Sequence, residues 1–303
     1  MAFEIIEFIK ENPGFVIDTI NSISNIIICG LFLKRKEGIK AATKELEKEK
    51  VRVLNVVAEE MLENGDISYY EYSKIKNYKE IAKKADQYRK KKTVAAQNMD
   101  WHIRFFEECG TVSDENLRDL WAKLLANEVD TPGNCSFRTL NTLKNLTPRE
   151  AFLFQRVCRG ALRIEESVAI LKIGDCLEKK GITYDDILKL DDCGLIRNDE
   201  LVRQAPFKDG RCFTKVSNDK ILLFKTQNKD PKAVMRIPQY LFTSAGRELY
   251  SVIGKEIDIQ EVVDLLKTQF PEYEIEHGEL QNSEPNKEVY KVGNETIQYV
   301  KIK

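Results

Sequence analysis

The chain has 303 residues, enough for two domains, because single hydrophobic cores rarely grow much beyond about 250 residues. Hydrophobic residues make up 42% of it and charged residues 32%, as in a soluble globular protein with many exposed helices. The formal net charge of -1 excludes a polycationic chain, so that any affinity for nucleic acid must come from a local patch. Glycine (15 residues) and proline (8) are sparse, which argues against a β-sandwich or a long disordered linker.

The apolar segment Phe15–Leu33 is about as long as a membrane span, but polar residues interrupt its first half. Its uninterrupted apolar run, Ile26–Leu33, has only eight residues, whereas a membrane-spanning helix needs about 20 predominantly apolar residues. We therefore expect a buried or partner-facing helix, and a cytoplasmic protein, because no secretory signal is present. Since Lys34, Arg35 and Lys36 follow the run directly, a membrane contact stays open as an alternative.

Residues 1–98 are predicted to form a helical arm. Pro13-Gly14 separates a short first helix from a second. The segment Gly38–Leu62 has strong helix formers and apolar residues near a period of 3.6, and Asn64-Gly65-Asp66 ends it as a turn. A third helix is predicted over Ser68–Gln97. Because few residues here could close a core alone, we expect the arm to pack on the rest of the chain or on another subunit.

The last helix of the arm is basic. Between Lys74 and Lys92, nine cations stand against two acidic residues, and Tyr78 and Tyr88 lie among them. Cations and aromatic rings on one helix could hold a phosphate backbone and stacked bases. We favour the alternative, a solvated helix surface. The residues that the nucleic-acid hypothesis would use are Lys76, Lys83, Lys84, Arg89, Lys90, Lys91 and Lys92.

A compact helical block is predicted over residues 99–148. Ser113 is the expected N-cap of a helix over Asp114–Val129, which would bury apolar residues at i, i+3, i+4, i+7 and i+8. The breaker Thr131-Pro132-Gly133 ends this helix, and Ser136 precedes another. Two capped helices are thus expected in this block.

The pattern changes to α+β after residue 148. Thr147 is the expected N-cap of a helix that begins at Pro148, and Glu150 completes a capping box. A short helix capped by Thr183 follows, and then Ile221–Thr226 and Ala233–Leu241 are predicted as two strands of a hairpin.

Helix, helix, strand and hairpin is the order of a winged helix. We therefore predict a winged-helix-like domain over residues 149–254, and a C-terminal helix with a small antiparallel sheet over 255–303. The expected fold class is mainly α with a smaller α+β part: an N-terminal helical arm, a helical core and a winged-helix-like C-terminal region.

The seven cysteines stand singly, with no CxxC pair. Their odd number and the missing secretory signal indicate reduced thiols that serve as small apolar residues. With two histidines, His102 and His277, far apart in sequence, we expect no metal site and no cofactor. His102 has acidic neighbours but is expected at the surface rather than in catalysis. The sequence contains no Walker loop, GxSxG, HExxH or paired-acid nuclease array, so that we expect no enzyme.

Two blocks of residues resemble a known family. The first is Trp101-(x3)-Phe105-Phe106, Ser113-Asp114-Glu115, Leu120-Trp121-Ala122-Lys123-Leu124-Leu125-Ala126-(x)-Glu128, Pro132-Gly133 and Ser136-Phe137-Arg138-Thr139-Leu140. The second is Thr243-(x)-Ala245-Gly246-Arg247-Glu248-Leu249. Together they resemble the bacterial domain-of-unknown-function family 2806, for which the resemblance implies no activity.

The layout is also similar to that of the abortive-infection alpha proteins. These combine a helical N-terminal arm, a Leu-Trp/Phe-Ala-x-Leu-Leu-Ala helix and a Leu-(Ser/Thr)-Pro-x-(Glu/Asp)-Ala start, which Leu146–Ala151 fits. The resemblance implies a role in bacterial defence against phage, by association and not by mechanism.

Two residue groups in the first block are candidate sites. Ser136, Arg138 and Thr139 stand near a helix start, where free N–H groups and a guanidinium could bind an anion or contact a partner. We favour a structural role for them, with Ser136 as a cap and Arg138 in an ion pair. The apolar residues of the motif are expected in the core rather than in a ligand cage: Trp101, Phe105, Phe106, Trp121, Leu124 and Leu125.

Three functions follow, in order of preference. The first is a non-catalytic interaction, scaffold or sensor protein of an anti-phage defence system, with a protein partner or self-association through the arm. The second is a nucleic-acid-binding winged-helix protein that uses the basic helix. Further cations near its presumed wing are Arg197, Arg203, Lys208, Arg211, Lys215 and Lys220. The third is a membrane-acting effector that inserts Ile26–Leu33.

Overall fold

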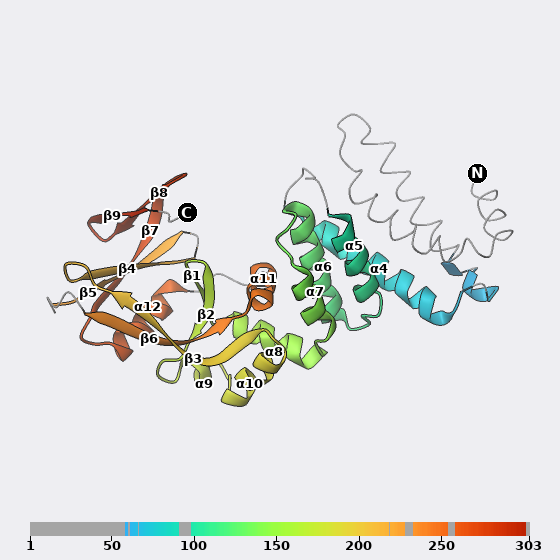
Figure 1. The fold of residues 1–303 in the computed structure, drawn as a ribbon, viewed down its shortest axis with the longest axis horizontal. Coiled ribbons are helices and arrows are strands. Elements are labelled where there is room, and N and C mark those ends of the chain that lie inside the picture. Colours follow the sequence, from blue (N-terminus) through green and yellow to red (C-terminus); the bar gives the residue numbers. More distant parts are fainter. Residues whose placement is uncertain are drawn as a thin grey trace. The chain divides into compact units, whose positions relative to one another are not determined.

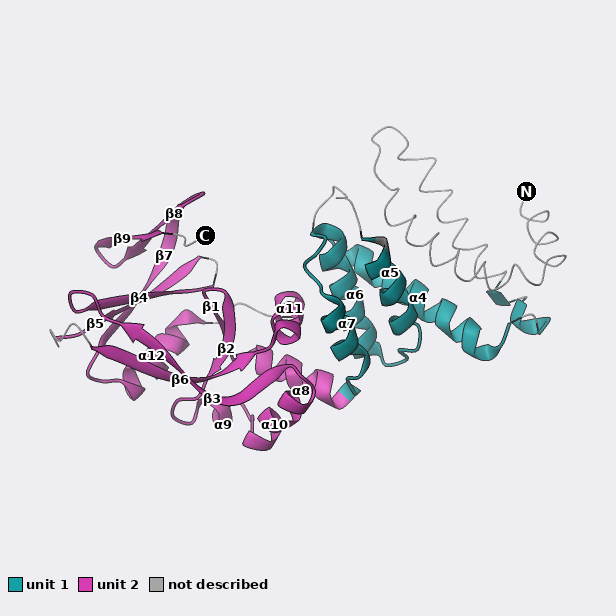
Figure 2. Cartoon of the chain, viewed as in Figure 1, with its two compact units in different colours: residues 1–148 teal, residues 149–303 magenta. Residues whose placement is uncertain are grey.

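The computed structural model describes residues 58–59, 61–65, 67–90, 98–217, 219–227, 233–253 and 258–300. The chain divides into two compact units, residues 1–148 and 149–303 (Figures 1 and 2). The predictions for Phe15–Leu33 and for the helices before residue 58 lie outside the described residues. No helix in the described part is long and apolar enough to cross a membrane.

The first unit is helical. Its helices are α4 (Tyr69–Tyr88), α5 (Met99–Cys109), α6 (Glu115–Asp130) and α7 (Phe137–Lys144). Helix α4 packs along α6, and α5 packs on α7 (Figure 1). Ser68 caps α4 in a reciprocal capping box with Glu71, which satisfies N–H groups that the first helical turn leaves open.

Helix α4 is shorter than the predicted Ser68–Gln97 helix. It ends at Tyr88, and Arg89 has extended backbone angles (φ -64°, ψ 129°). The backbone N–H of Lys90 donates to the Asp130 carboxylate over 2.6 Å, and the Arg89 side chain contacts the same carboxylate. This tertiary contact draws the chain off the helical path, although the local sequence favours a helix.

Helix α6 starts one residue later than the caps predicted. Asp114, and not Ser113, is the N-cap, and its carboxylate accepts from the N–H groups of Asn116 and Leu117, each over 3.0 Å. An aspartate at this position also interacts favourably with the positive end of the helix dipole. The predicted buried positions are confirmed: Leu117, Leu120, Trp121, Leu124 and Leu125.

The second unit is built on one sheet. Its elements are α8 (Pro148–Cys158), β1 (Ala161–Ile164), β2 (Ser167–Leu171), α9 (Cys176–Lys179), α10 (Tyr184–Asp192), β3 (Ile196–Pro206), β4 (Arg211–Val216), β5 (Lys220–Lys225), β6 (Val234–Phe242), α11 (Ser244–Ile253), α12 (Ile259–Gln269), β7 (Glu274–Glu284), β8 (Lys287–Val292) and β9 (Glu295–Val300). The strands form a nine-stranded antiparallel sheet in the order β3-β6-β2-β1-β4-β5-β7-β8-β9. The molecule is therefore mixed α/β: the predicted helical N-terminal part is confirmed, but the sheet that follows it is larger than the predicted smaller α+β part.

The predicted strands Ile221–Thr226 and Ala233–Leu241 exist as β5 and β6, but they do not form a hairpin. Strand β5 pairs with β4 and β7, whereas β6 pairs with β2 and β3. The turn Asp209-Gly210 between β3 and β4, where both residues have positive φ (52° and 71°), was not predicted. An Asp-Gly pair between alternating strands is a strong hairpin signal.

Both faces of β5 are covered, which explains its continuous apolar run Ile221–Phe224. Leu222 and Phe224 belong to a core that includes four residues of α12 (Ile259, Val262, Val263, Leu266), while Ile221 and Leu223 pack with Tyr290 on the other face. The predicted C-terminal sheet is present as β7, β8 and β9, but β7 pairs with β5 and so joins the large sheet. A strand buried on both faces loses the period-2 alternation that identifies a half-exposed strand.

Candidate interaction site on the helical unit

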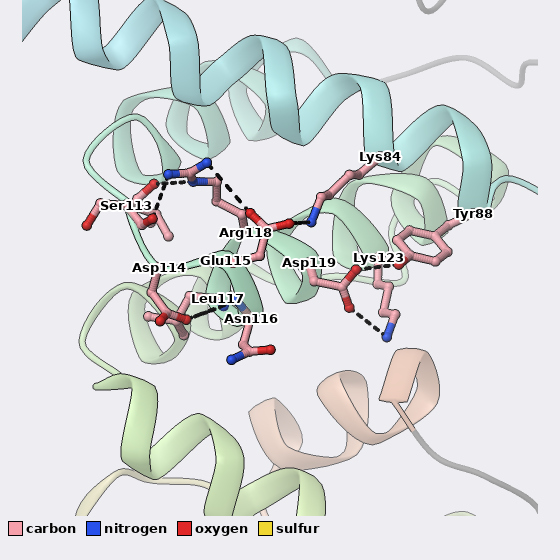
Figure 3. A network of polar contacts seen from close by, with 11 residues as sticks. Lys84, Tyr88, Ser113, Asp114, Glu115, Asn116, Leu117, Arg118, Asp119 and Lys123 are labelled. Atoms are coloured by element: carbon pink, nitrogen blue, oxygen red, sulfur yellow. Dashed lines mark hydrogen bonds and ion pairs between the residues drawn. The ribbon is translucent and has the colours of Figure 1, made fainter.

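The contact between α4 and α6 is lined by alternating cations and acids. The Lys84 ammonium contacts the Glu115 carboxylate, and the Tyr88 hydroxyl donates to Asp119 (Figure 3). Lys123 lies 2.8 Å from the other oxygen of Asp119. The hydrogen bond to Asp119, together with burial, raises the pKa of the Tyr88 phenol to about 12. Tyr88 is therefore a neutral donor to the carboxylate at neutral pH.

Arg118 holds the loop that precedes α6. Its guanidinium donates to the carbonyl oxygens of Val112 (3.1 Å) and Ser113 (2.6 Å), and it lies 3.8 Å from the Glu115 carboxylate (Figure 3). Because Glu115 also contacts Lys84, this one carboxylate connects the loop, α6 and α4. Such charge-assisted bonds to backbone carbonyls fix the loop conformation at the start of α6.

A buried ion pair closes the other end of this contact. Arg89 Nε lies 3.1 Å from Asp130 Oδ1, and the two side chains are 7% and 9% exposed. Asp130 also accepts from the N–H of Lys90. A buried carboxylate with several donors is held firmly, because breaking either contact would leave a desolvated charge.

Part of the predicted nucleic-acid surface is therefore used inside the fold. Lys84 and Arg89 contact acids of α6, and the Tyr78 ring is buried and packs edge-on against Phe106 at 5.6 Å. The described cations that remain exposed in this set are Lys76, Lys83 and Lys90. Lys91 and Lys92 lie outside the described residues.

The aromatic residues of the motif form the core. Phe105 stacks on Trp101 with ring centroids 5.1 Å apart and meets Trp121 edge-on at 5.2 Å. Phe106, Leu124 and Leu125 are also buried, so that none of this group faces solvent.

His102 is fully buried, which corrects the expectation of a surface residue. Its ring packs edge-on against Trp101 at 5.1 Å, and burial lowers the pKa of the imidazole to about 4. The imidazole is therefore neutral at pH 7. Its acidic neighbours in the sequence gave no indication of burial, because residues at i+5 or i−2 lie on other faces of the helix.

The proposed anion site is arranged around a helix cap. The Ser136 hydroxyl accepts from the N–H of Thr139 over 3.3 Å, and Thr139 is buried. Arg138 is exposed and makes no ion pair with a described residue. Of the three residues, Arg138 is the one that presents its functional group to solvent.

Glu128 was one of the acids, with Asp114 and Glu115, expected to form the ion pair of Arg138, but it has a different role. Its buried carboxylate accepts from the N–H groups of Gly133 (2.7 Å) and Cys135 (2.9 Å) and so holds the loop between α6 and α7. An acid on the apolar face of a helix, just before a Pro-Gly loop, is the signal that could have identified it.

An exposed aromatic surface lies at the start of α4. Tyr69 is 75% exposed and Tyr70 57% exposed, and the Lys74 ammonium lies 4.7 Å from the centre of the Tyr70 ring. We call Tyr69, Tyr70 and Lys74 the tyrosine patch. Large exposed aromatic side chains cost solvation free energy, and tyrosine is enriched in protein interfaces.

The described residues hold no group of three His, Cys, Asp or Glu side chains that could bind a metal ion. The six cysteines in this part, Cys109, Cys135, Cys158, Cys176, Cys193 and Cys212, are free, and all but Cys193 are buried. They behave as the small apolar residues that were expected.

A helical unit with a buried aromatic motif, followed by a unit with one antiparallel sheet, defines a two-unit α/β protein. The chain belongs to the family described as "Protein of unknown function (DUF2806)", whose model matches residues 66–267. The match includes both blocks that resemble this family and most of the sheet. Neither the curated proteins nor the solved structures gave a match.

Proposed function

We propose that this protein is a non-catalytic cytoplasmic interaction protein, a scaffold or sensor, of a bacterial anti-phage defence system. The observation that carries the proposal is the tyrosine patch. Tyr69 and Tyr70 are adjacent and exposed on the first turn of α4, whose C-terminal end is fixed to α6 by the ion pairs of Lys84 and Arg89. A rigid helix that presents aromatic side chains suits protein recognition, because little conformational entropy is lost on binding.

The link to defence rests on the layout shared with the abortive-infection alpha proteins. The Leu-Trp-Ala-x-Leu-Leu-Ala segment lies in α6, and Pro148 of the Leu-Thr-Pro-x-Glu-Ala segment begins α8. Similar layout supports an association of function and no chemical mechanism.

Phage plating on a bacterial host that expresses the full chain tests the proposal. The double variant Tyr69→Ala/Tyr70→Ala should lose protection, while Tyr184→Ala, an equally exposed tyrosine on α10 (56%), should keep it. Both variants should fold, since exposed aromatic residues contribute little to stability. Equal protection by wild type and the double variant, or no protection by either, would refute the proposed role of the patch.

The mass of the purified chain gives a second measurement. A defined oligomer or a stable complex that dissociates in the double variant supports a scaffold that acts through the patch. A monomer at micromolar concentration, with no partner in a protecting host, contradicts it.

Nucleic-acid binding is the second candidate, because one observation favours it. The succession α8, β2, α9, α10, β3 and β6, with the sheet order β3-β6-β2, resembles that of a winged helix, with β1, β4 and β5 as additional strands. We therefore propose a winged-helix-like fold for residues 149–254.

The charge of this domain opposes binding of a duplex. Helix α10 occupies the position of a recognition helix, yet it exposes Asp185, Asp191 and Asp192. Carboxylates on this helix would repel phosphates, whereas nucleic-acid affinity depends on cations. Gel mobility of DNA and RNA at low salt decides between the candidates. Salt-dependent binding that weakens in Lys76→Glu/Lys83→Glu would replace the interaction proposal, and unchanged mobility would remove the nucleic-acid candidate.

A further inference from the structure

The second unit contains an open groove between β3 and β4, which does not depend on the function proposed above. At the turn between these strands, Lys208 and Arg211 exchange two backbone hydrogen bonds of 2.7 and 3.0 Å. Beyond this pair the strands separate: β3 pairs with β6 on its other side, and β4 pairs with β5 and, at Val216, with β1. The space between them is a groove of about 630 Å³.

A proline accounts for the separation. In the register set by Lys208 and Arg211, the next hydrogen-bonded pair would be Pro206 and Phe213. Proline has no N–H, so that the hairpin ladder cannot continue in the usual way. The missing N–H of Pro206 therefore favours the groove over a continuous hairpin.

Both walls of the groove present open backbone groups: β3 is an edge strand of the sheet, and β4 pairs with β1 only at Val216, beyond the groove. The bond from Phe207 N to Ala233 O shows that alternate residues of β3 face β6, so that Val202 and Gln204 direct their N–H and C=O groups toward the groove. On β4, the bond from Thr226 N to Gly210 O shows that Gly210 and every second residue after it face β5. Phe213 therefore directs its N–H and C=O groups away from β5, toward the groove. In the described part of the chain, these groups form no backbone ladder.

The two ends of the groove carry charge. At one end stand Lys208 and Arg211, of which Lys208 makes no ion pair in the described part and Arg211 lies 3.0 Å from Glu295. At the other end Arg203 pairs with Glu165 at 2.8 Å. The turn that joins β3 to β4 thus closes the first end to a chain that would run straight through.

We propose that this groove binds the C-terminal end of an extended peptide. The open edge of β3 matches the N–H and C=O groups of an extended main chain, which would add to β3 as a further strand. A chain that stops at the closed end places its terminal carboxylate against Lys208 and Arg211. The carboxylates of Asp209 and Glu165 also line the groove, which disfavours a polyanion such as nucleic acid.

Fluorescence anisotropy of the full chain with a labelled peptide tests this inference. The probe is an N-terminally labelled hexapeptide of alternating valine and serine with a free C-terminus, and its control is the same peptide with an amidated C-terminus. We expect saturable binding of the free acid and at least about tenfold weaker binding of the amide, as for loss of one charge-assisted contact.

Three variants locate the site. Lys208→Glu should weaken binding at least about tenfold, whereas Lys291→Glu, the same charge change at an exposed strand position of β8, should leave it unchanged. Pro206→Val supplies the missing N–H, lets the hairpin ladder continue and should abolish binding without loss of the fold. Hydrogen exchange should slow at Val202, Gln204 and Phe213 when the peptide is added.

The inference fails if the peptide does not bind at about 1 mM, or if the acid and the amide bind equally. It also fails if Pro206→Val binds like wild type. Binding of a single-stranded oligonucleotide that Lys208→Glu abolishes would assign the groove to nucleic acid instead. None of these outcomes bears on the proposed role of the tyrosine patch, because that role is tested with variants in the first unit.

Discussion

Gly246 lies so close to Leu195 that a Cβ at position 246 would stand 2.0 Å from the Leu195 carbonyl oxygen. That oxygen accepts from the N–H of Thr243 over 3.0 Å, and the Thr243 hydroxyl donates to the carbonyl of Gly194 and accepts from the N–H of Gly246. Arg247 donates to the carbonyl of Glu166 over 3.0 Å. The motif Thr243-(x)-Ala245-Gly246-Arg247 thus joins the start of α11 to the start of β3 and to the β1–β2 turn.

Gly246→Ala should destabilise the protein by about 2–3 kcal/mol, because the added methyl group meets a backbone oxygen that cannot move alone. An exposed glycine in a helix shows the opposite sign and gains about 1 kcal/mol on the same change. Urea unfolding measures the difference, and Ser251→Ala on the same helix is the control, expected within about 0.5 kcal/mol of wild type. A stabilised Gly246→Ala variant would show that α11 does not approach Leu195 in this way.

Asp130→Ala should lower the free energy of unfolding by about 3–5 kcal/mol, because it leaves the buried Arg89 guanidinium without its carboxylate. Glu115→Ala removes an ion pair of which the acid is 69% exposed, and should cost at most about 1 kcal/mol. Denaturant titration of both variants checks the contrast. Equal losses of unfolding free energy in the two variants would mean that the Arg89–Asp130 pair is exposed to water.

Glu128→Ala should cost about 2–4 kcal/mol, since two backbone N–H groups, of Gly133 and Cys135, lose their acceptor. Glu128→Gln keeps one carbonyl oxygen and should cost roughly half as much. The matched surface control is Glu107→Ala, with an expected change below about 0.5 kcal/mol. If Gln and Ala prove equivalent, the loop is held by contacts other than this acceptor.

The free energy of unfolding should decrease as the pH is lowered, because His102 becomes protonated on unfolding. Burial lowers the imidazole pKa from an ordinary value of 6.5 to about 4 in the folded state, so that the unfolded chain binds the proton more tightly. The stabilisation is complete above about pH 6.5 and is lost as the pH falls toward 4, with a total of about 3 kcal/mol.

Urea midpoints between pH 4 and 8 measure this effect. His102→Gln should flatten the wild-type dependence in the window from pH 6.5 to 4, whatever its stability at pH 7, because glutamine does not titrate. An unchanged slope in His102→Gln would assign the acid sensitivity to other groups.

The local sequence determined several helix starts in both units and the apolar faces of the helical unit. Ser136 and Thr183 cap the helices that they were predicted to cap, and Leu120, Trp121 and Leu124 are buried as their spacing indicated. Caps and helical periodicity involve residues within about four positions of each other, so that they can be read from neighbouring letters.

Only the tertiary structure decided what pairs across long separations. Strand β5 pairs with β7, which lies about fifty residues later in the chain. Arg89 forms an ion pair with Asp130, the last residue of α6. Strand pairing depends on the burial of side chains over the whole sheet, and ion pairing depends on which charges are desolvated together. Neither can be inferred from a short stretch of sequence. For the same reason the sequence showed only a row of cations, and the fold decides that Lys84 and Arg89 among them contact acids of α6.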